Sequence, residues 1–204
     1  MSMIDDIVQL EWQAFDTVQN EGGRASCQDN FETFEIMRKS QFLAWDVATL
    51  AAYYADLKAA AQQGRNLIQE KYARMMASTA PAEYAGFAHL LPPLSLWQQR
   101  TIERLVETQV DWREAFARAY PHLSGQARAI RTADDTPYTT SFETYLRGEL
   151  GTYSEDTLRA YARMIDDLQQ EDRNLTTETM AHTARLYGYA SLDEAERKTG
   201  GSAS

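Results

Sequence analysis

One stretch of the chain occurs twice, and this repetition limits the choice of folds more than any other feature. Residues 33–70 align with residues 141–178 at a constant shift of 108 positions (141 − 33) and without a gap, and 11 of the 38 aligned pairs are identical. Average residue frequencies would give about three identities by chance. We therefore interpret the repeat as an internal duplication, which predicts two similar helical units packed about a pseudo-twofold axis.

Apolar residues recur at helical spacing along nearly the whole chain, and no segment alternates with the period of two of a strand. Polar residues that cap helices precede the expected helices. These residues are Asp29, Asp46, Asn66, Ser95, Thr140, Ser154, Asn174 and Ser191. The sequence thus predicts an all-α fold of nine to ten helices in a single domain over residues 1–196, with a main irregular loop at 121–139 and a mobile tail at 197–204.

The charge balance excludes several classes of partner. The chain has 30 Asp and Glu against 20 Lys and Arg, a net charge of −10, so it repels nucleic-acid backbones and anionic membranes. No apolar stretch is long enough to span a bilayer, and the N-terminal residues lack the basic and apolar regions of a signal peptide. The chain has one cysteine and therefore no intramolecular disulfide. We expect a cytoplasmic protein that binds neither nucleic acid nor membrane.

The single cysteine, Cys27, lies two residues before the expected helix cap Asp29. A helix N-terminus and the nearby Arg24 would stabilise a thiolate, which makes Cys27 a candidate nucleophile. The alternative is a small, buried apolar residue, the usual role of a lone intracellular cysteine. The sequence leaves both interpretations open.

A set of cationic and polar side chains forms the predicted substrate site. Guanidinium groups bind carboxylates and phosphates through two parallel hydrogen bonds, so arginines on converging segments indicate a cleft between the repeats for a small anionic metabolite. The predicted substrate-binding residues are Arg24, Gln28, Arg38, Arg65, Asn66, Lys71, Tyr145 and Arg147. The alternative is pairing within helices, because Glu35–Arg38 and Glu143–Arg147 have helical spacing.

Carboxylates complete the predicted chemistry. Glu35, Glu70 and Glu143, together with Glu149, are candidates for a general acid or base if they are buried. Glu35 and Glu143 match across the repeat, so they either face each other or repeat one helix contact. The three histidines lack the spacing of known metal motifs, and no phosphate-binding glycine loop is present. We therefore predict no metal and no cofactor.

Five polar motifs resemble one bacterial family. They are residues 20–28, 33–42, 64–76, 139–150 and 187–195, which extend over nearly the whole chain. They resemble the family catalogued as domain of unknown function 4125. The resemblance implies a cytoplasmic bacterial protein and brings with it no reaction and no catalytic residues. Motifs this polar are unusual for an all-α core and favour a ligand site over a purely structural scaffold.

Three hypotheses for the function follow. The leading one is an enzyme that acts on a small carboxylate- or phosphate-bearing metabolite, with arginines on the anion, Cys27 as nucleophile or polar wall, and a glutamate as acid or base. The alternative is a non-catalytic protein that binds a ligand or docks on a partner enzyme. The third is a structural homodimer whose polar motifs only cap helices and pair charges.

Overall fold

The computed structural model describes residues 2–18 and 23–201. In this part of the chain eleven α-helices and three short 3-10 helices (η) follow one another, and no β-strand is present. The predicted all-α class is confirmed. The number of helices exceeds the predicted nine to ten.

The helices form two runs with a short connection between them. The first run comprises α1 (Met3–Asp16), η1 (Ser26–Asp29), α2 (Phe31–Leu43), α3 (Val47–Gln62) and α4 (Leu67–Thr79). The connection contains α5 (Pro81–Phe87) and η2 (Ala88–Leu90). The second run comprises α6 (Leu96–Ala119), α7 (Pro121–Gly125), η3 (Thr132–Asp134), α8 (Phe142–Leu150), α9 (Glu155–Gln170), α10 (Leu175–Leu186) and α11 (Leu192–Gly201).

Two segments are more helical than the sequence suggested. Helix α7 lies inside the segment 121–139 that was expected to be irregular, and its first residue is Pro121, a residue that suits the first turn of a helix because it needs no N–H partner there. Helix α11 continues to Gly201. Residues 197–201 of the predicted tail are therefore helical, and residues 202–204 lie outside the described part of the chain.

Most helices begin at the predicted caps. The confirmed caps are Asp46, Asn66, Ser95, Ser154, Asn174 and Ser191. Two predictions were wrong by one residue. Asn30 caps α2, because the carboxylate of Asp29 accepts a hydrogen bond from Arg24 instead. Ser141 caps α8 in place of Thr140, since the Ser141 hydroxyl is the group that accepts from the Thr144 N–H.

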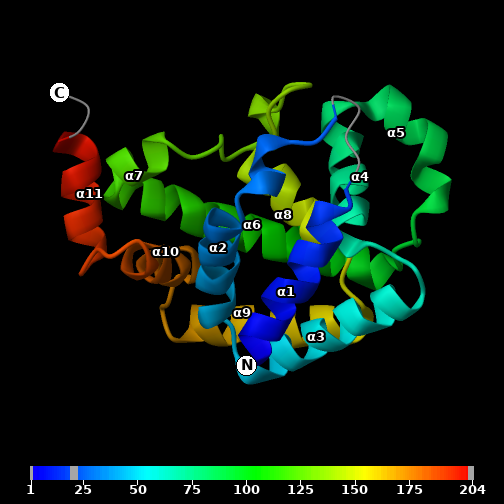
Figure 1. Cartoon of the computed structure of the whole chain (residues 1–204), viewed down its shortest axis with the longest axis horizontal. Helices are drawn as coiled ribbons and strands as arrows, with labels where there is room; N and C mark the ends of the chain where they lie inside the picture. Colours follow the sequence, from blue (N-terminus) through cyan, green and yellow to red (C-terminus); the bar gives the residue numbers. More distant parts are fainter. Residues whose placement is uncertain (1, 19–22, 202–204) are drawn as a thin grey trace.

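The two runs of helices are interleaved (Figure 1). Helix α2 of the first run packs against α10 of the second, and α8 of the second run packs against α4 of the first. Helices α3 and α9 contact each other, α1 packs against α2, α3 and α4, and α6 packs against α8, α9 and α10. Helices α1, α2, α3 and α4 thus correspond to α6, α8, α9 and α10, and they make the corresponding contacts.

Polar contacts also correspond between the two runs. We call two positions matched when they differ by 108 between α2–α4 and α8–α10, or by 98 (112 − 14) between α1 and α6. Asn66 and Asn174 each cap a helix and donate an Nδ2–H to a carbonyl oxygen, that of Ala14 on α1 (2.7 Å) and that of Trp112 on α6 (3.1 Å). A duplication would produce such agreement. The duplicated origin itself stays a prediction.

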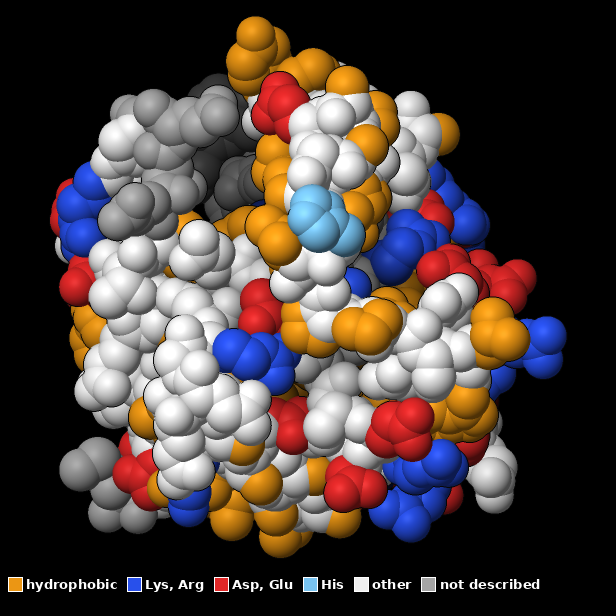
Figure 2. Space-filling model, turned by 90° about the vertical axis from the view of Figure 1, so that its right-hand side faces the viewer, with side chains coloured by type: hydrophobic (Ala, Val, Ile, Leu, Met, Phe, Trp, Pro, Cys, Tyr) orange, Lys and Arg blue, Asp and Glu red, His pale blue; other side chains and the backbone are white. Residues whose placement is uncertain are grey.

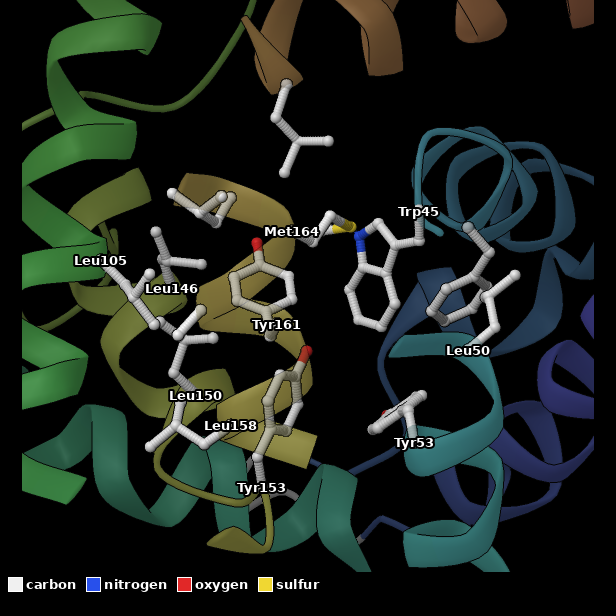
Figure 3. Close-up of a cluster of buried hydrophobic side chains, with 14 of the residues drawn as sticks. Trp45, Leu50, Tyr53, Leu105, Leu146, Leu150, Tyr153, Leu158, Tyr161 and Met164 are labelled. Carbon is white, nitrogen blue, oxygen red and sulfur yellow. The ribbon is translucent and has the colours of Figure 1, made fainter. Parts of the chain in front are cut away.

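The centre of the core is a group of matched aromatic residues (Figure 3). Trp45 and Tyr161 have ring centroids 5.2 Å apart, as do Tyr53 and Tyr153. Trp45 matches Tyr153, and Tyr53 matches Tyr161. All four side chains are buried, and leucines from α3, α6, α8 and α9 surround them. Contacts of this kind contribute about 0.5–1.5 kcal/mol per pair beyond burial, so Tyr53 and Tyr161 stabilise the core.

The surface carries charges of both signs. On the face shown in Figure 2, basic, acidic and hydrophobic side chains are interspersed, and no single sign of charge prevails. Over the described residues, no helix is both long and apolar enough to cross a bilayer.

The double role of the cap asparagines leads to a stability prediction. Asn174→Ala removes a helix cap and the bond to the Trp112 carbonyl, so the free energy of unfolding should fall by about 2 kcal/mol. The control Asn30→Ala removes a cap alone and should cost about 1 kcal/mol. Urea unfolding measures both, and equal losses would contradict the role of the Trp112 contact.

Candidate functional site

Three of the predicted site residues lie in the segment after α1. The Arg24 guanidinium donates to the carboxylates of Asp16 and Asp29. The buried Gln28 side chain donates to two carbonyl oxygens at the end of α1. These contacts tie the segment to α1 and leave both residues away from the pocket described below. The side chain of Cys27 lies outside the described residues, so its role as a nucleophile stays a prediction.

Other predicted residues hold helices in place. Arg65 binds both carboxylate oxygens of Glu70, at 2.8 and 2.7 Å. Asn66 caps α4, and Glu35 accepts a hydrogen bond from Lys39 within α2. Arg65 also lines a small hollow of about 280 Å³ between α3, α4 and residues 92–98. The structure does not bring these residues together into one site.

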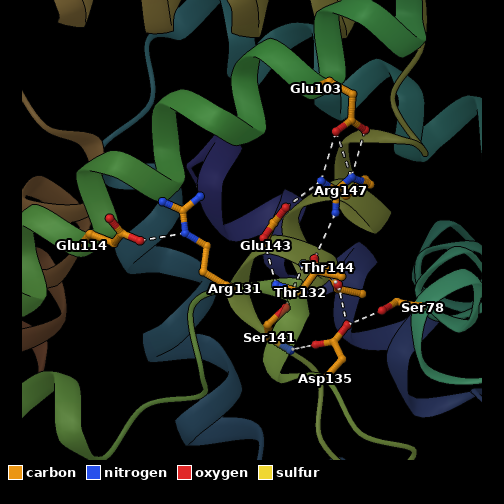
Figure 4. Close-up of polar contacts among 10 residues, drawn as sticks. All are labelled: Ser78, Glu103, Glu114, Arg131, Thr132, Asp135, Ser141, Glu143, Thr144 and Arg147. Carbon is orange, nitrogen blue, oxygen red and sulfur yellow. Dashed lines mark hydrogen bonds and ion pairs between the residues drawn. The ribbon is translucent and has the colours of Figure 1, made fainter.

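Arg147 and Glu143 belong to a polar network that holds the segment before α8 (Figure 4). Arg147 donates to Glu103 and Glu143, and Glu143 accepts from the Thr132 N–H. Burial alone would raise the pKa of Glu143, but the hydrogen bonds from Thr132 and Arg147 outweigh it and lower that pKa. Asp135 similarly accepts from Ser78, Ser141 and Thr144. None of these residues lines the pocket described below, so the network holds α8 and the segment before it in place.

Four buried charges from four helices form the ion cluster of the protein. Arg38 on α2 binds both carboxylate oxygens of Glu11 on α1, each at 2.6 Å. The same guanidinium lies 3.4 Å from Glu149 on α8, and Lys71 on α4 lies 3.6 Å from the other Glu149 oxygen. None of the four side chains is more than 10% exposed. The two positive and two negative charges cancel.

The charges of the ion cluster set each other's ionisation. Burial would raise the pKa of Glu149, but Arg38 and Lys71 outweigh it and lower that pKa to about 2. Burial would lower the pKa of Lys71, but Tyr145 and Glu149 outweigh it and raise that pKa to about 12. At neutral pH Glu149 is therefore a carboxylate and Lys71 an ammonium. Both groups serve as fixed charges rather than as groups that gain or lose protons.

A pocket of about 450 Å³ opens beside the ion cluster, between α2, α6, α8, α10 and residues 127–128. Arg38, Gln41 and Glu149 form its charged wall, where the Gln41 amide donates to Glu149 (2.9 Å). The other lining residues are Met37, Trp45, Gln109, Arg113, Ala127, Arg128, Phe142, Tyr145, Leu146, Tyr161, Leu175, Thr176, Thr179, Met180 and Thr183. Of the predicted residues, Arg38, Tyr145 and Glu149 line this pocket. Lys71 does not line it but contacts Tyr145 and Glu149.

The pocket is open because the second run carries other side chains than the first at the matched positions. In the first run the aromatic ring of Phe15 stacks on that of Phe34 at 5.3 Å and packs with Ile68. The side chains on that side are Phe15, Ile68, Lys71, Tyr72 and Met75, and their matched residues are Arg113, Thr176, Thr179, Met180 and Thr183. Three threonines thus replace larger side chains along the pocket face of α10.

Two arginines of the pocket have no carboxylate partner in the described part of the chain. The Arg113 guanidinium lies 5.7 Å from the centre of the Phe142 ring. Arg128 lies 4.6 Å from the centre of the Tyr145 ring and donates to the Thr140 carbonyl. Burial, and then the charge of Arg128, lower the pKa of Arg113. These two charges, unlike those of the ion cluster, are not compensated.

Tyr145 connects the ion cluster with the pocket. Its hydroxyl oxygen accepts a hydrogen bond from Lys71 Nζ at 2.7 Å. Because the lysine supplies the proton of that bond, the hydroxyl proton of Tyr145 remains available to a ligand. Among the described residues no group of three or more carboxylate, histidine or cysteine side chains is placed to hold a metal ion.

Sequence reasoning missed Glu11, Gln41, Arg113 and Arg128. Glu11 had a signal, because it stands in the apolar stripe of α1 between Val8 and Phe15, and all three are buried. A charged residue on such a face indicates a buried partner. No comparable signal exists for the arginines, since the absence of a partner can be recognised only in the folded chain.

The fold and the site define an all-α protein with a buried ion cluster beside a cation-lined pocket. Over residues 1–197 the chain matches the family described as Protein of unknown function (DUF4125), and it belongs to this family. The predicted resemblance is confirmed. Searches among curated proteins and solved structures found no match.

Glu149→Gln tests the ion cluster. The variant leaves Arg38 and Lys71 with the carboxylate of Glu11 alone, so the free energy of unfolding at pH 7 should fall by about 3–5 kcal/mol. The control Asp166→Asn breaks the exposed ion pair with Arg104 and should cost less than about 1 kcal/mol. Urea titration distinguishes the two, and a small loss for Glu149→Gln would rule out strong coupling.

The same variant should change the acid dependence of stability. The pKa of Glu149 falls from 4.5 to about 2 on folding, so its stabilisation of about 3 kcal/mol is complete above pH 4.5 and is lost as the pH falls from about 4.5 to 2. Glu149→Gln should lower the slope of the unfolding free energy against pH in this window. An unchanged slope would show that other carboxylates produce the acid dependence.

Proposed function

We propose that the protein binds a small metabolite that carries a carboxylate or phosphate group, in the pocket between α2, α6, α8 and α10. The observation that carries this proposal is that two arginines of this one pocket, Arg113 and Arg128, have no carboxylate partner among the described residues. Arg74, beside the smaller hollow, also lacks a carboxylate partner among the described residues, but the other arginine of that hollow, Arg65, is neutralised by Glu70. Arg24, Arg65 and Arg147 each bind at least one carboxylate.

A bound anion would stabilise arginines that have no carboxylate partner. Arg113 is half-buried and loses part of its hydration, and a bound anion compensates for that loss through charge-assisted hydrogen bonds. Arg128 is exposed and contributes a second positive charge. The ring contacts with Phe142 and Tyr145 hold both side chains over the pocket wall, so little conformational entropy remains to be lost on binding. The pocket is thus prepared for an anionic group before the ligand arrives.

The rest of the pocket suits the organic part of a metabolite. Its volume of about 450 Å³ is in the range of small-molecule sites, which are mostly apolar with a few polar groups. Met37, Phe142, Leu146, Leu175 and Met180 supply the apolar surface. We therefore expect a ligand with one charged end and one apolar or aromatic end.

Binding is tested by thermal shift with a panel of small carboxylates and phosphates. A ligand at about 100 times its Kd contributes about 2.7 kcal/mol, which raises Tm by about 5–10 °C. Arg113→Gln and Arg128→Gln should remove most of this rise, whereas the control Arg104→Gln, in an exposed ion pair, should keep it.

A second variant fills the pocket. Thr183→Met introduces the residue that α4 carries at the matched position, Met75. We expect loss of binding with Tm in the absence of ligand preserved. If ligands still stabilised this variant and both arginine variants, the site would lie elsewhere.

Catalysis in the same pocket is the second candidate, because Lys71 leaves the hydroxyl proton of Tyr145 available. Tyr145 would then donate a proton to the bound ligand. In that case Tyr145→Phe should retain binding and abolish conversion of the ligand, followed by NMR of the reaction mixture. A ligand that binds and stays unchanged in the native protein would indicate a binding protein.

A further inference from the structure

We propose, on the basis of the function proposed above, that the charged end of the ligand is a dianionic phosphate monoester group bound between Arg113 and Arg128. A single carboxylate would leave one of the two positive charges uncompensated. The ligand class is therefore a phosphorylated metabolite with an apolar or aromatic organic part.

The count of charges around the pocket supports a dianion. In the ion cluster, Arg38 and Lys71 are balanced by Glu11 and Glu149. Arg113 and Arg128 add two further positive charges with no carboxylate partner among residues 2–18 and 23–201. A phosphate monoester carries between one and a half and two negative charges at neutral pH, which matches this excess.

The two guanidinium groups also act on each other. The charge of Arg128 contributes to the lowered pKa of Arg113, so the groups lie within electrostatic reach. Such repulsion is relieved most by a ligand group that bonds to both arginines at once. A phosphate has three terminal oxygens for this purpose, and a carboxylate has two.

Neutral donors line the same pocket as the two arginines. Thr176 and Thr179 line the pocket from α10, and their hydroxyls have no hydrogen-bond partner within the described chain. Their matched residues on α4 are Ile68 and Lys71. Hydroxyls in place of an apolar side chain and a cation add donors without adding charge. They suit a phosphate that already has both arginines as counter-charges.

The experiment compares three probes of similar shape: phenyl phosphate, phenyl sulfate and benzoate. Isothermal titration calorimetry in a phosphate-free buffer is run at pH 5.0 and 7.5. The second ionisation of a phosphate monoester has a pKa near 6, so only phenyl phosphate gains a second negative charge between these pH values. Phenyl sulfate, a monoanion throughout, corrects for any titration of the protein.

We expect phenyl phosphate to bind about five- to tenfold more tightly at pH 7.5 than at pH 5.0, because its dianionic fraction rises from about 9% to about 97%. Phenyl sulfate should change less than twofold, and both it and benzoate should bind more weakly than phenyl phosphate at pH 7.5. Arg113→Gln and Arg128→Gln should each reduce this pH effect to about twofold. Arg128 is exposed, so its variant is informative even if Arg113→Gln fails to fold.

The outcomes separate this inference from the function on which it rests. If phenyl sulfate or benzoate bound as tightly as phenyl phosphate at pH 7.5, one negative charge would suffice. The dianion inference would then fall, and the proposed anion site would stand. If none of the three probes bound at either pH, both would fall.

Discussion

The ion cluster of Glu11, Arg38, Lys71 and Glu149 is the interaction on which the rest of the structure depends. It joins α1, α2, α4 and α8 at the place where the two runs of helices interleave. Removing each charge from water costs several kcal/mol, which good geometry and additional hydrogen bonds must offset. Those bonds are present, because Tyr53 donates to Glu11 and Gln41 to Glu149. Since an apolar replacement is often as stable, we attribute the cluster to the position it imposes on the pocket wall.

The two runs of helices carry different side chains at the positions of the ion cluster. Arg38 and Lys71 match Leu146 and Thr179, and Glu11 matches Gln109. In one half, charged and aromatic side chains fill the space between helices. In the other half, threonines stand at three of the matched positions, and a pocket remains between the helices. The same arrangement of helices therefore supports a solid core on one side and a pocket on the other, and the difference lies in side-chain volume and charge.

The acidic surface and the cationic pocket are compatible because they act over different distances. Salt screens exposed charges beyond about 8–10 Å, so the net charge of −10 has little effect inside the pocket. There the nearest charges decide, and the nearest uncompensated ones are Arg113 and Arg128. A small anion that reaches the pocket meets two guanidiniums, whereas a long polyanion would meet the acidic surface.

The sequence alone determined the all-α class, most helix caps and the matched helices, because these depend on contacts between residues a few positions apart or on the repeat itself. It also selected Arg38, Lys71 and Tyr145, which differ between the two halves. Only the tertiary structure decided which arginines are paired. Arg147 has Glu143 at helical spacing in the sequence, but its second partner, Glu103, comes from α6. Arg113 has no acidic residue three or four positions away, and folding brings it no carboxylate from the described chain. Pairing depends on neighbours brought close by folding, whereas the spacing of residues along a chain reports only local neighbours.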